Sequence, residues 1–184
     1  AEAQGVLRVL TETLDIPRRA IEPDLVQWAY DHKGIPAEIP HLSDYGVEHY
    51  GHIDRPKVSL EKLFKTPFWA NFYSNEIKTR ESDRLRQPLM PFTIKVVAQN
   101  NWAMVTLPCE LFVEWSYAIY ENSLFEHTTV VELANGWNGY IPTKKAFERK
   151  GGYETKEVTS TMLIPEAGEM ILETVIRMLN AAKT

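Results

Sequence analysis

The sequence contains one cysteine, no long apolar run and no extended basic run, and each shortage excludes a class of protein. Because Cys109 is alone, the chain cannot form an internal disulfide or a cysteine-rich zinc ribbon. No apolar stretch approaches the roughly 18–20 residues that are needed to span a bilayer. Lysine and arginine never cluster beyond adjacent pairs and the net charge is −5, so non-specific binding to nucleic acid is not expected.

What is present fits one soluble domain. Hydrophobic residues make up 44% of the 184 positions and charged residues 24%, which is enough apolar material for a sizeable core. The first residues lack an initiator methionine and resemble neither a signal peptide nor a transit peptide. We therefore expect residues 1–184 to be a single domain that forms the C-terminal portion of a larger protein, although a processed mature N-terminus would look the same.

The spacing of apolar residues assigns most of the chain to helices and strands. A helix is predicted over residues 5–14, because Leu10 and Leu14 fall on one helical face together with Val6 and Leu7. Residues 33–58 show neither the helical nor the strand spacing of apolar residues and are expected to be an irregular excursion. Further helices are predicted from Pro23, from Thr66-Pro67, over residues 111–122 and from Pro165, and strands over residues 92–98, 102–107 and 127–134.

Some of these elements carry more detailed predictions. Val113, Tyr117 and Tyr120 share one face of the helix that contains them and are expected to be available for packing. The nearly unbroken apolar run of residues 102–107 is typical of a central strand that is buried on both faces. The charged residues 78–86 are expected to form a solvated tail of the preceding helix.

Strand 102–107, helix 111–122 and strand 127–134 form a βαβ unit, whose right-handed crossover makes the two strands parallel. The fold class is therefore α/β, with a mixed sheet that contains this unit and with flanking helices. Catalytic and ligand groups gather at the carboxyl ends of such strands, where Glu110 and Tyr140 are expected on one rim. An acid and a phenol there could bind a metal or handle a proton. Alternatively, Glu110 complements the helix N-terminus and Tyr140 packs its ring.

Other candidate groups have weaker patterns. Glu110 and Glu114 are four residues apart on one predicted helical face, either as acid/base carboxylates or as two solvated acids. His49 and His52 have the spacing of metal ligands on one turn, but their segment lacks a helical pattern, which favours a plain loop. His127 begins a predicted strand and is interpreted as a structural or surface residue.

A set of motifs follows in order through the C-terminal half of the chain. They are Leu107-Pro108-Cys109-Glu110, Val130-Val131-Glu132-Leu133-Ala134-Asn135-Gly136-Trp137-Asn138-Gly139-Tyr140-Ile141-Pro142-Thr143, Gly152-Tyr153-Glu154 and Pro165-Glu166-Ala167-Gly168-Glu169. Together they resemble the neutral/alkaline, non-lysosomal ceramidase family, in the C-terminal third of its catalytic domain. The resemblance covers roughly residues 90–182.

Members of that family are zinc amidases that cleave the N-acyl bond of a lipid amide, and the resemblance implies roles for three residues. Glu110 and Tyr140 correspond to zinc ligands. Tyr153 corresponds to a tyrosine at the reaction centre, with one residue more of spacing than in the family. The two zinc-binding histidines belong to the N-terminal portion of the family's domain, which is outside this chain. That portion is the implied partner, a lipid amide is the implied substrate, and relatives are often exported.

Cys109 departs from the family pattern, which has glycine at this position. Glycine permits a tight backbone path, so the cysteine could strain that path or place its thiol beside the metal. On residue type alone, Cys109 could also be a thiolate nucleophile. No histidine follows at close sequence range, however, and a small buried thiol is favoured.

The leading hypothesis is a C-terminal fragment of a ceramidase-like, zinc-dependent amidohydrolase that supplies part of the zinc site. The isolated chain is then expected to be inactive, to bind zinc weakly or not at all, and to self-associate through exposed apolar surface. The rival hypothesis is a non-catalytic binding or scaffold module with a degenerate site. Its contact surface would be the excursion at residues 33–58, which is rich in aromatic residues and histidine.

Overall fold

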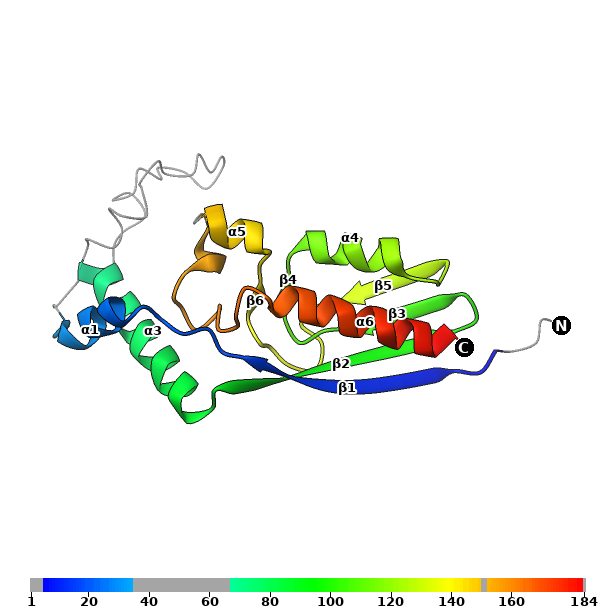
Figure 1. Cartoon of the computed structure of the whole chain (residues 1–184), viewed down its shortest axis with the longest axis horizontal. Helices are drawn as coiled ribbons and strands as arrows, with labels where there is room; N and C mark the ends of the chain where they lie inside the picture. Colours follow the sequence, from blue (N-terminus) through cyan, green and yellow to red (C-terminus); the bar gives the residue numbers. More distant parts are fainter. Residues whose placement is uncertain (1–4, 35–66, 150–151, 184) are drawn as a thin grey trace. The chain divides into compact units, whose positions relative to one another are not determined.

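The computed structural model describes residues 5–34, 67–149 and 152–183, which form two compact units (Figure 1). The larger unit comprises the described residues of Ala1–Ala20 and Asp83–Thr184, and the smaller unit those of Ile21–Ser82. Apart from its first two residues, the predicted excursion at residues 33–58 lies outside the described residues, and His49 and His52 lie outside them too.

A four-stranded mixed sheet organises the larger unit, with strand order β1-β2-β3-β5. The first two pairings are antiparallel and the last, between β3 and β5, is parallel. This arrangement confirms the predicted α/β class and the predicted parallel βαβ unit, in which α4 is the crossover. The elements are β1 (Arg8–Pro17), β2 (Leu89–Gln99), β3 (Trp102–Thr106), α4 (Val113–Asn122) and β5 (His127–Val131).

The helix predicted over residues 5–14 is wrong, because residues 8–14 belong to strand β1 and residues 5–7 are not helical. The strand pairs with β2 along its whole length, from Arg8 opposite Ala98 to Pro17 opposite Leu89. Leu10 and Leu14 misled the prediction, since a spacing of four fits both a helical face and one face of a strand. Pairing with β2 decides between the two, and the side chains of β1 alternate between more and less exposed positions.

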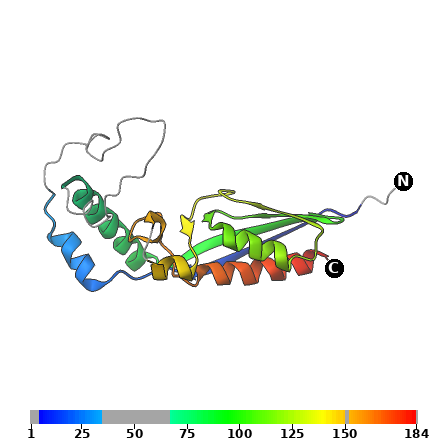
Figure 2. The same cartoon turned by 90° about the horizontal axis from the view of Figure 1, so that it is seen from above.

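The core lies between one face of the sheet and the helices α4 and α6 (Ala167–Lys183), which run side by side (Figure 2). Strand β2 alternates as predicted, because every second residue from Met90 to Ala98 is buried. Helix α6 starts two residues after the predicted Pro165. It buries Ile171, Val175 and Leu179 in the main core.

One burial prediction in this region is wrong. Strand β3 is not buried on both faces, because Trp102 is 38% exposed while the neighbouring Ala103 is fully buried. The face of α4 that contains Tyr117 is also exposed; the helix instead buries Ser116 and Ile119. Apolar residues occur on two sides of α4, so periodicity alone does not identify the side that meets α6. The exposed residues of that face are Val113, Tyr117 and Tyr120, at 56%, 59% and 43%.

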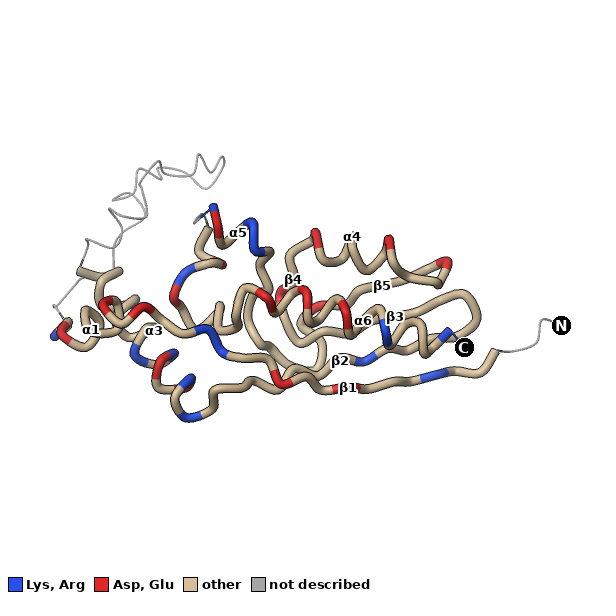
Figure 3. The backbone as a smooth tube through the Cα atoms, in the orientation of Figure 1, with Lys and Arg blue, Asp and Glu red and all other residues tan. Residues whose placement is uncertain are grey.

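The smaller unit contains α1 (Pro23–Asp31) and most of α3 (Pro67–Arg86). Both helices begin at the proline that the sequence predicted. Proline is tolerated there because amides in the first turn of a helix make no hydrogen bond within the helix. Charges of both signs follow one another along the second half of α3 (Figure 3). The prediction that this tail is solvated is wrong at Arg80, which is 2% exposed. Among the helices of the described residues, none has both the length and the apolar character to cross a bilayer.

Candidate functional site

The loops that follow β3 and β5 are joined by backbone hydrogen bonds. The amide of Leu133 donates to the Cys109 carbonyl at 3.1 Å, and the amide of Ala134 donates to the Leu107 carbonyl at 3.0 Å. Further along, the amide of Asn138 donates to the Pro108 carbonyl. Because parallel strands end on the same side of a sheet, the two loops meet there and continue the pairing beyond the strands. Main-chain hydrogen bonds therefore hold together the rim on which Glu110 and Tyr140 were expected.

Glu110 and Tyr140 are direct neighbours on this rim. They begin two short parallel strands, β4 (Glu110–Leu111) and β6 (Tyr140–Ile141), and are register partners of one another. The Glu110 amide donates to the Gly139 carbonyl at 3.0 Å, which sets that register. The structure thus brings together two residues that are 30 positions apart in the chain.

A glycine makes the approach to Tyr140 possible. Gly139 has a φ of 78°, and a Cβ atom there would fall on the carbonyl oxygen of Ser160 and 2.8 Å from its carbonyl carbon. Real Cβ contacts are essentially never that short, so the segment around Ser160 can lie against the rim only beside glycine. The adjacent amide of Tyr140 donates to the same Ser160 carbonyl at 2.7 Å, which fixes the tyrosine backbone from a second side.

Tyr153 completes the group of residues that the sequence singled out. It begins the short 3-10 helix η2 (Tyr153–Thr155), and its hydroxyl lies 2.8 Å from the hydroxyl of Tyr140. The two rings meet edge to face, with centroids 5.4 Å apart and an interplanar angle of 85°. Tyr153 is 53% exposed, so its hydroxyl is both hydrogen-bonded to the rim and open to an incoming molecule.

Two neighbours on the rim affect the pKa of Tyr140. The pKa of Tyr140 is raised above its ordinary value, first by a hydrogen bond with the Glu110 carboxylate and next by the hydrogen bond with Tyr153. Loss of the Tyr140 proton would place a phenolate beside a carboxylate, which explains why the pKa of Tyr140 is raised. The Oε2 atom of Glu110 is buried and has no hydrogen-bond partner among the described residues. An oxygen of this kind is costly to leave unpaired.

Cys109 proves to be the small buried thiol that the sequence favoured. It is fully buried in the main core, and burial raises the pKa of its thiol, with added repulsion from Glu132 and Glu110. A neutral, inaccessible thiol is not a nucleophile. Cys109 is not among the residues with a left-handed backbone, so it does not strain the loop in the way that replacement of glycine suggested.

The remaining candidates do not join the site. Glu110 lies on β4 and α4 begins only at Val113, so the prediction that Glu110 and Glu114 share a helical face is wrong. His127 starts β5 with its side chain 69% exposed, which agrees with a surface residue. Among the described residues, no group of three or more histidines, cysteines or acids could hold a metal ion. The metal and reaction-centre roles of Glu110, Tyr140 and Tyr153 stay predictions.

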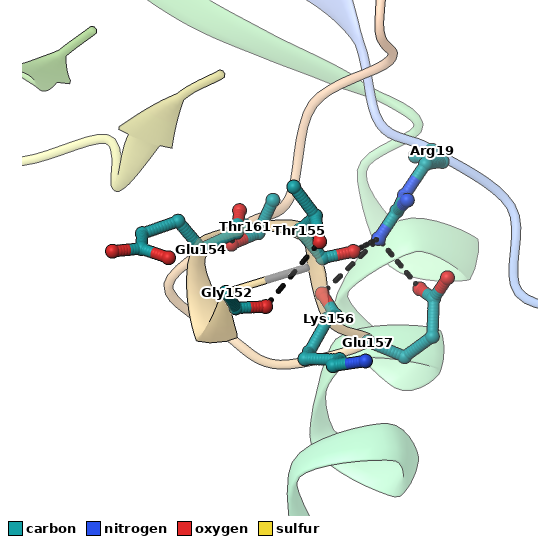
Figure 4. A network of polar contacts seen from close by, with 7 residues as sticks. All are labelled: Arg19, Gly152, Glu154, Thr155, Lys156, Glu157 and Thr161. Carbon is teal, nitrogen blue, oxygen red and sulfur yellow. Dashed lines mark hydrogen bonds and ion pairs between the residues drawn. The ribbon is translucent and has the colours of Figure 1, made fainter. Parts of the chain in front are cut away.

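Sequence reasoning missed one residue that borders the site. Arg19 stands in the sequence only as half of a basic pair, and nothing in its spacing connects it with Tyr153. In the structure its side chain contacts the turn that follows Tyr153 (Figure 4).

Comparison with known proteins finds similarity at the level of the backbone. No family model matches the chain, and no curated protein matches it. One similar solved structure is the neutral ceramidase from Pseudomonas aeruginosa, with a TM-score of 0.44, 17% identity and coverage of 51% of this chain and 16% of that one. Another is a ceramidase complexed with C2, with a TM-score of 0.43, 18% identity and coverage of 52% and 15%. The chain thus spans about a sixth of the length of either ceramidase.

Proposed function

We propose that this chain supplies part of the active site of a zinc-dependent amidohydrolase, resembling a neutral ceramidase, that hydrolyses an N-acyl amide bond. The observation that carries the proposal is the placement of Glu110 in register with Tyr140, whose hydroxyl is hydrogen-bonded to that of Tyr153. These three residues belong to three separate motifs of the chain, and the family resemblance assigned a role to each of them.

Glu110 and Tyr140 are the residues that would hold the metal. Carboxylate and phenol oxygens are suitable zinc donors, and the buried, unpartnered Oε2 of Glu110 marks a place where a cation would be stabilised. The pKa of Tyr140 is raised beside Glu110, and a bound cation would favour the deprotonated phenol there. Bound zinc would lower the pKa of a water molecule and polarise the amide carbonyl.

Tyr153 acts on the substrate in this proposal. Its exposed hydroxyl can donate a hydrogen bond to the oxygen of the amide carbonyl, where negative charge develops as the carbon becomes tetrahedral. The hydrogen bond with Tyr140 holds the Tyr153 hydroxyl at the rim before substrate arrives. Preorganisation of this kind avoids the cost of orienting the donor during the reaction.

The site as described is incomplete. A catalytic zinc ion takes about three protein ligands and a water molecule, whereas the described residues offer Glu110 and Tyr140. We therefore propose that histidines from an N-terminal portion of the full-length protein complete the site. The isolated chain should show no amide hydrolysis, and titration calorimetry should detect weak zinc binding or none. Stoichiometric, tight zinc binding by the chain alone would contradict this division of the site.

The deciding experiment uses the full-length protein that contains this chain. Glu110→Gln removes the anionic ligand at nearly constant size and should abolish both zinc content, measured by elemental analysis, and hydrolysis of a fluorescent N-acyl amide. Glu114→Gln is the matched control, because Glu114 is an exposed acid of the adjacent helix. Unchanged zinc content and turnover in Glu110→Gln would refute the role of Glu110, and the non-catalytic binding or scaffold module would become the better account.

A further inference from the structure

Arg19 is tied to the turn that carries Tyr153 by several kinds of contact at once (Figure 4). Its Nη2 atom donates to the main-chain carbonyls of Thr155 at 3.3 Å and Lys156 at 3.1 Å. The same nitrogen lies 2.9 Å from a carboxylate oxygen of Glu157, in an ion pair whose side chains are 16% and 27% exposed. The guanidinium carbon lies 4.8 Å from the ring centroid of Phe147 in α5 (Lys144–Arg149).

The backbone of Arg19 is itself anchored. Its amide donates to the Met162 carbonyl at 2.8 Å, and the preceding Arg18 forms an antiparallel bridge with Leu163. The guanidinium therefore projects from main chain that is fixed to one end of the segment between Tyr153 and Leu163. Because both the backbone and the guanidinium of Arg19 are held by contacts, we expect its side chain to have a fixed conformation.

The turn that Arg19 grips contacts the rim through Tyr153. Within the turn, the Lys156 amide donates to the Tyr153 carbonyl at 3.1 Å, and the Thr161 hydroxyl donates to the Glu154 carbonyl at 2.7 Å. These bonds make residues 152–157 a compact turn. A displacement of Thr155 to Glu157, which Arg19 contacts, would therefore also move Tyr153. The Tyr153 side chain is half exposed and has its hydroxyl 2.8 Å from that of Tyr140, a contact that depends on the position of the whole turn.

We propose that Arg19 is a positioning residue, which holds the turn at residues 152–157 so that the Tyr153 hydroxyl reaches Tyr140 and the amide substrate. The proposal rests on the proposed function, because it takes Tyr153 to act on the substrate. Two carbonyls and a carboxylate converge on the Nη2 nitrogen of one planar cation, whose hydrogens are held in the fixed guanidinium plane. Lysine could keep the ion pair with Glu157 but would lose the fixed donor plane.

The first test measures the position of Tyr153 without any activity assay. In the 184-residue chain with labelled tyrosines, the nuclear Overhauser effect between the Tyr140 and Tyr153 rings reports their contact, with assignments from Tyr140→Phe and Tyr153→Phe. Arg19→Ala should abolish this cross-peak, and Arg19→Lys should weaken it. Arg8→Ala is the control, because Arg8 is an exposed arginine of β1, the strand that precedes Arg19. A full-strength cross-peak in any folded Arg19 variant overturns the proposal, and Arg19→Lys serves this purpose if Arg19→Ala does not fold.

The second test uses turnover by the full-length protein. Arg19→Ala should lower kcat by roughly ten- to a hundredfold, as expected for a misplaced catalytic group, and leave KM nearly unchanged. In a Tyr153→Phe background, Arg19→Ala should have no further effect on kcat. Additive losses would show that Arg19 acts on stability alone and would overturn the proposal. If Tyr153→Phe by itself leaves kcat unchanged, the proposed function of Tyr153 fails, whereas a lost ring contact in Arg19→Ala would still establish the positioning.

Discussion

Replacement of Gly139 by alanine tests whether the close approach of the Ser160 segment builds the site. The new Cβ atom would overlap the Ser160 carbonyl, with its carbonyl carbon at 2.8 Å. Carbon atoms pack comfortably at about 3.5–4.0 Å, so the two backbones must separate by roughly 1 Å. That movement breaks the hydrogen bond of 2.7 Å from the Tyr140 amide to Ser160.

The expected loss of stability has two parts. Alanine in the left-handed region that Gly139 occupies costs about 1–2 kcal/mol. The broken hydrogen bond adds about 0.5–1.5 kcal/mol. A total of about 1.5–3.5 kcal/mol should lower the melting temperature of a chain of this size by roughly 3–14 °C. Thermal unfolding followed by tryptophan fluorescence measures the shift.

Gly136→Ala is the matched control in the same loop. Gly136 also has a positive φ, 149°, but its added Cβ would meet only the Cβ of Pro108, at an ordinary 3.5 Å. This variant should keep the ring contact between Tyr140 and Tyr153, which Gly139→Ala should lose. Equal melting temperatures for the two variants, with the ring contact intact in both, would refute the reasoning that Gly139 admits the Ser160 segment.

Three further predictions concern the rest of the larger unit. Phe92→Ala empties a fully buried core position and should cost about 3–5 kcal/mol in urea unfolding, whereas Thr93→Ala on the other face of β2 should cost far less. The bidentate pair with Arg177 lowers the pKa of Glu12, so its stabilisation is present above the ordinary glutamate pKa and is lost as the pH falls through the folded value. Glu12→Gln should therefore lower the melting temperature at pH 7 more than at pH 3, and an equal effect at both would contradict this. Light scattering should show self-association of the isolated chain through exposed apolar residues such as Val9 and Trp102, and a monomer at every concentration would argue against it.

The parallel unit was predictable because its signals are local and consistent. A long apolar strand, a helix and a second strand leave one permitted handedness, and that handedness alone puts Glu110 and Tyr140 on one rim. The position of Tyr153 beside them was not derivable from spacing, because its turn is held by contacts with Thr161 and Arg19. It was indicated by the family resemblance alone.

The misassigned elements have a common physical cause. Leu10 and Leu14 fit a helix and a strand equally well, and the choice is made by β2, which lies more than 70 residues later in the chain. Likewise, Tyr117 and Ile119 compete for the buried side of α4, and contact with α6 selects Ile119. A local pattern names the residues that can be buried, whereas distant partners decide which of them are.

The two-residue ladder between β4 and β6 limits how homologous chains can vary. Insertions in the turn between α4 and β5 fall at the opposite end of the strands and leave the pairing of Glu110 with Tyr140 in place. A single insertion between Val131 and Tyr140 would instead shift the register by one and turn the phenol to the other side of the ladder. Homologous chains that keep Glu110 opposite Tyr140 should therefore vary in length between α4 and β5. The segment between Val131 and Tyr140 should have a constant number of residues.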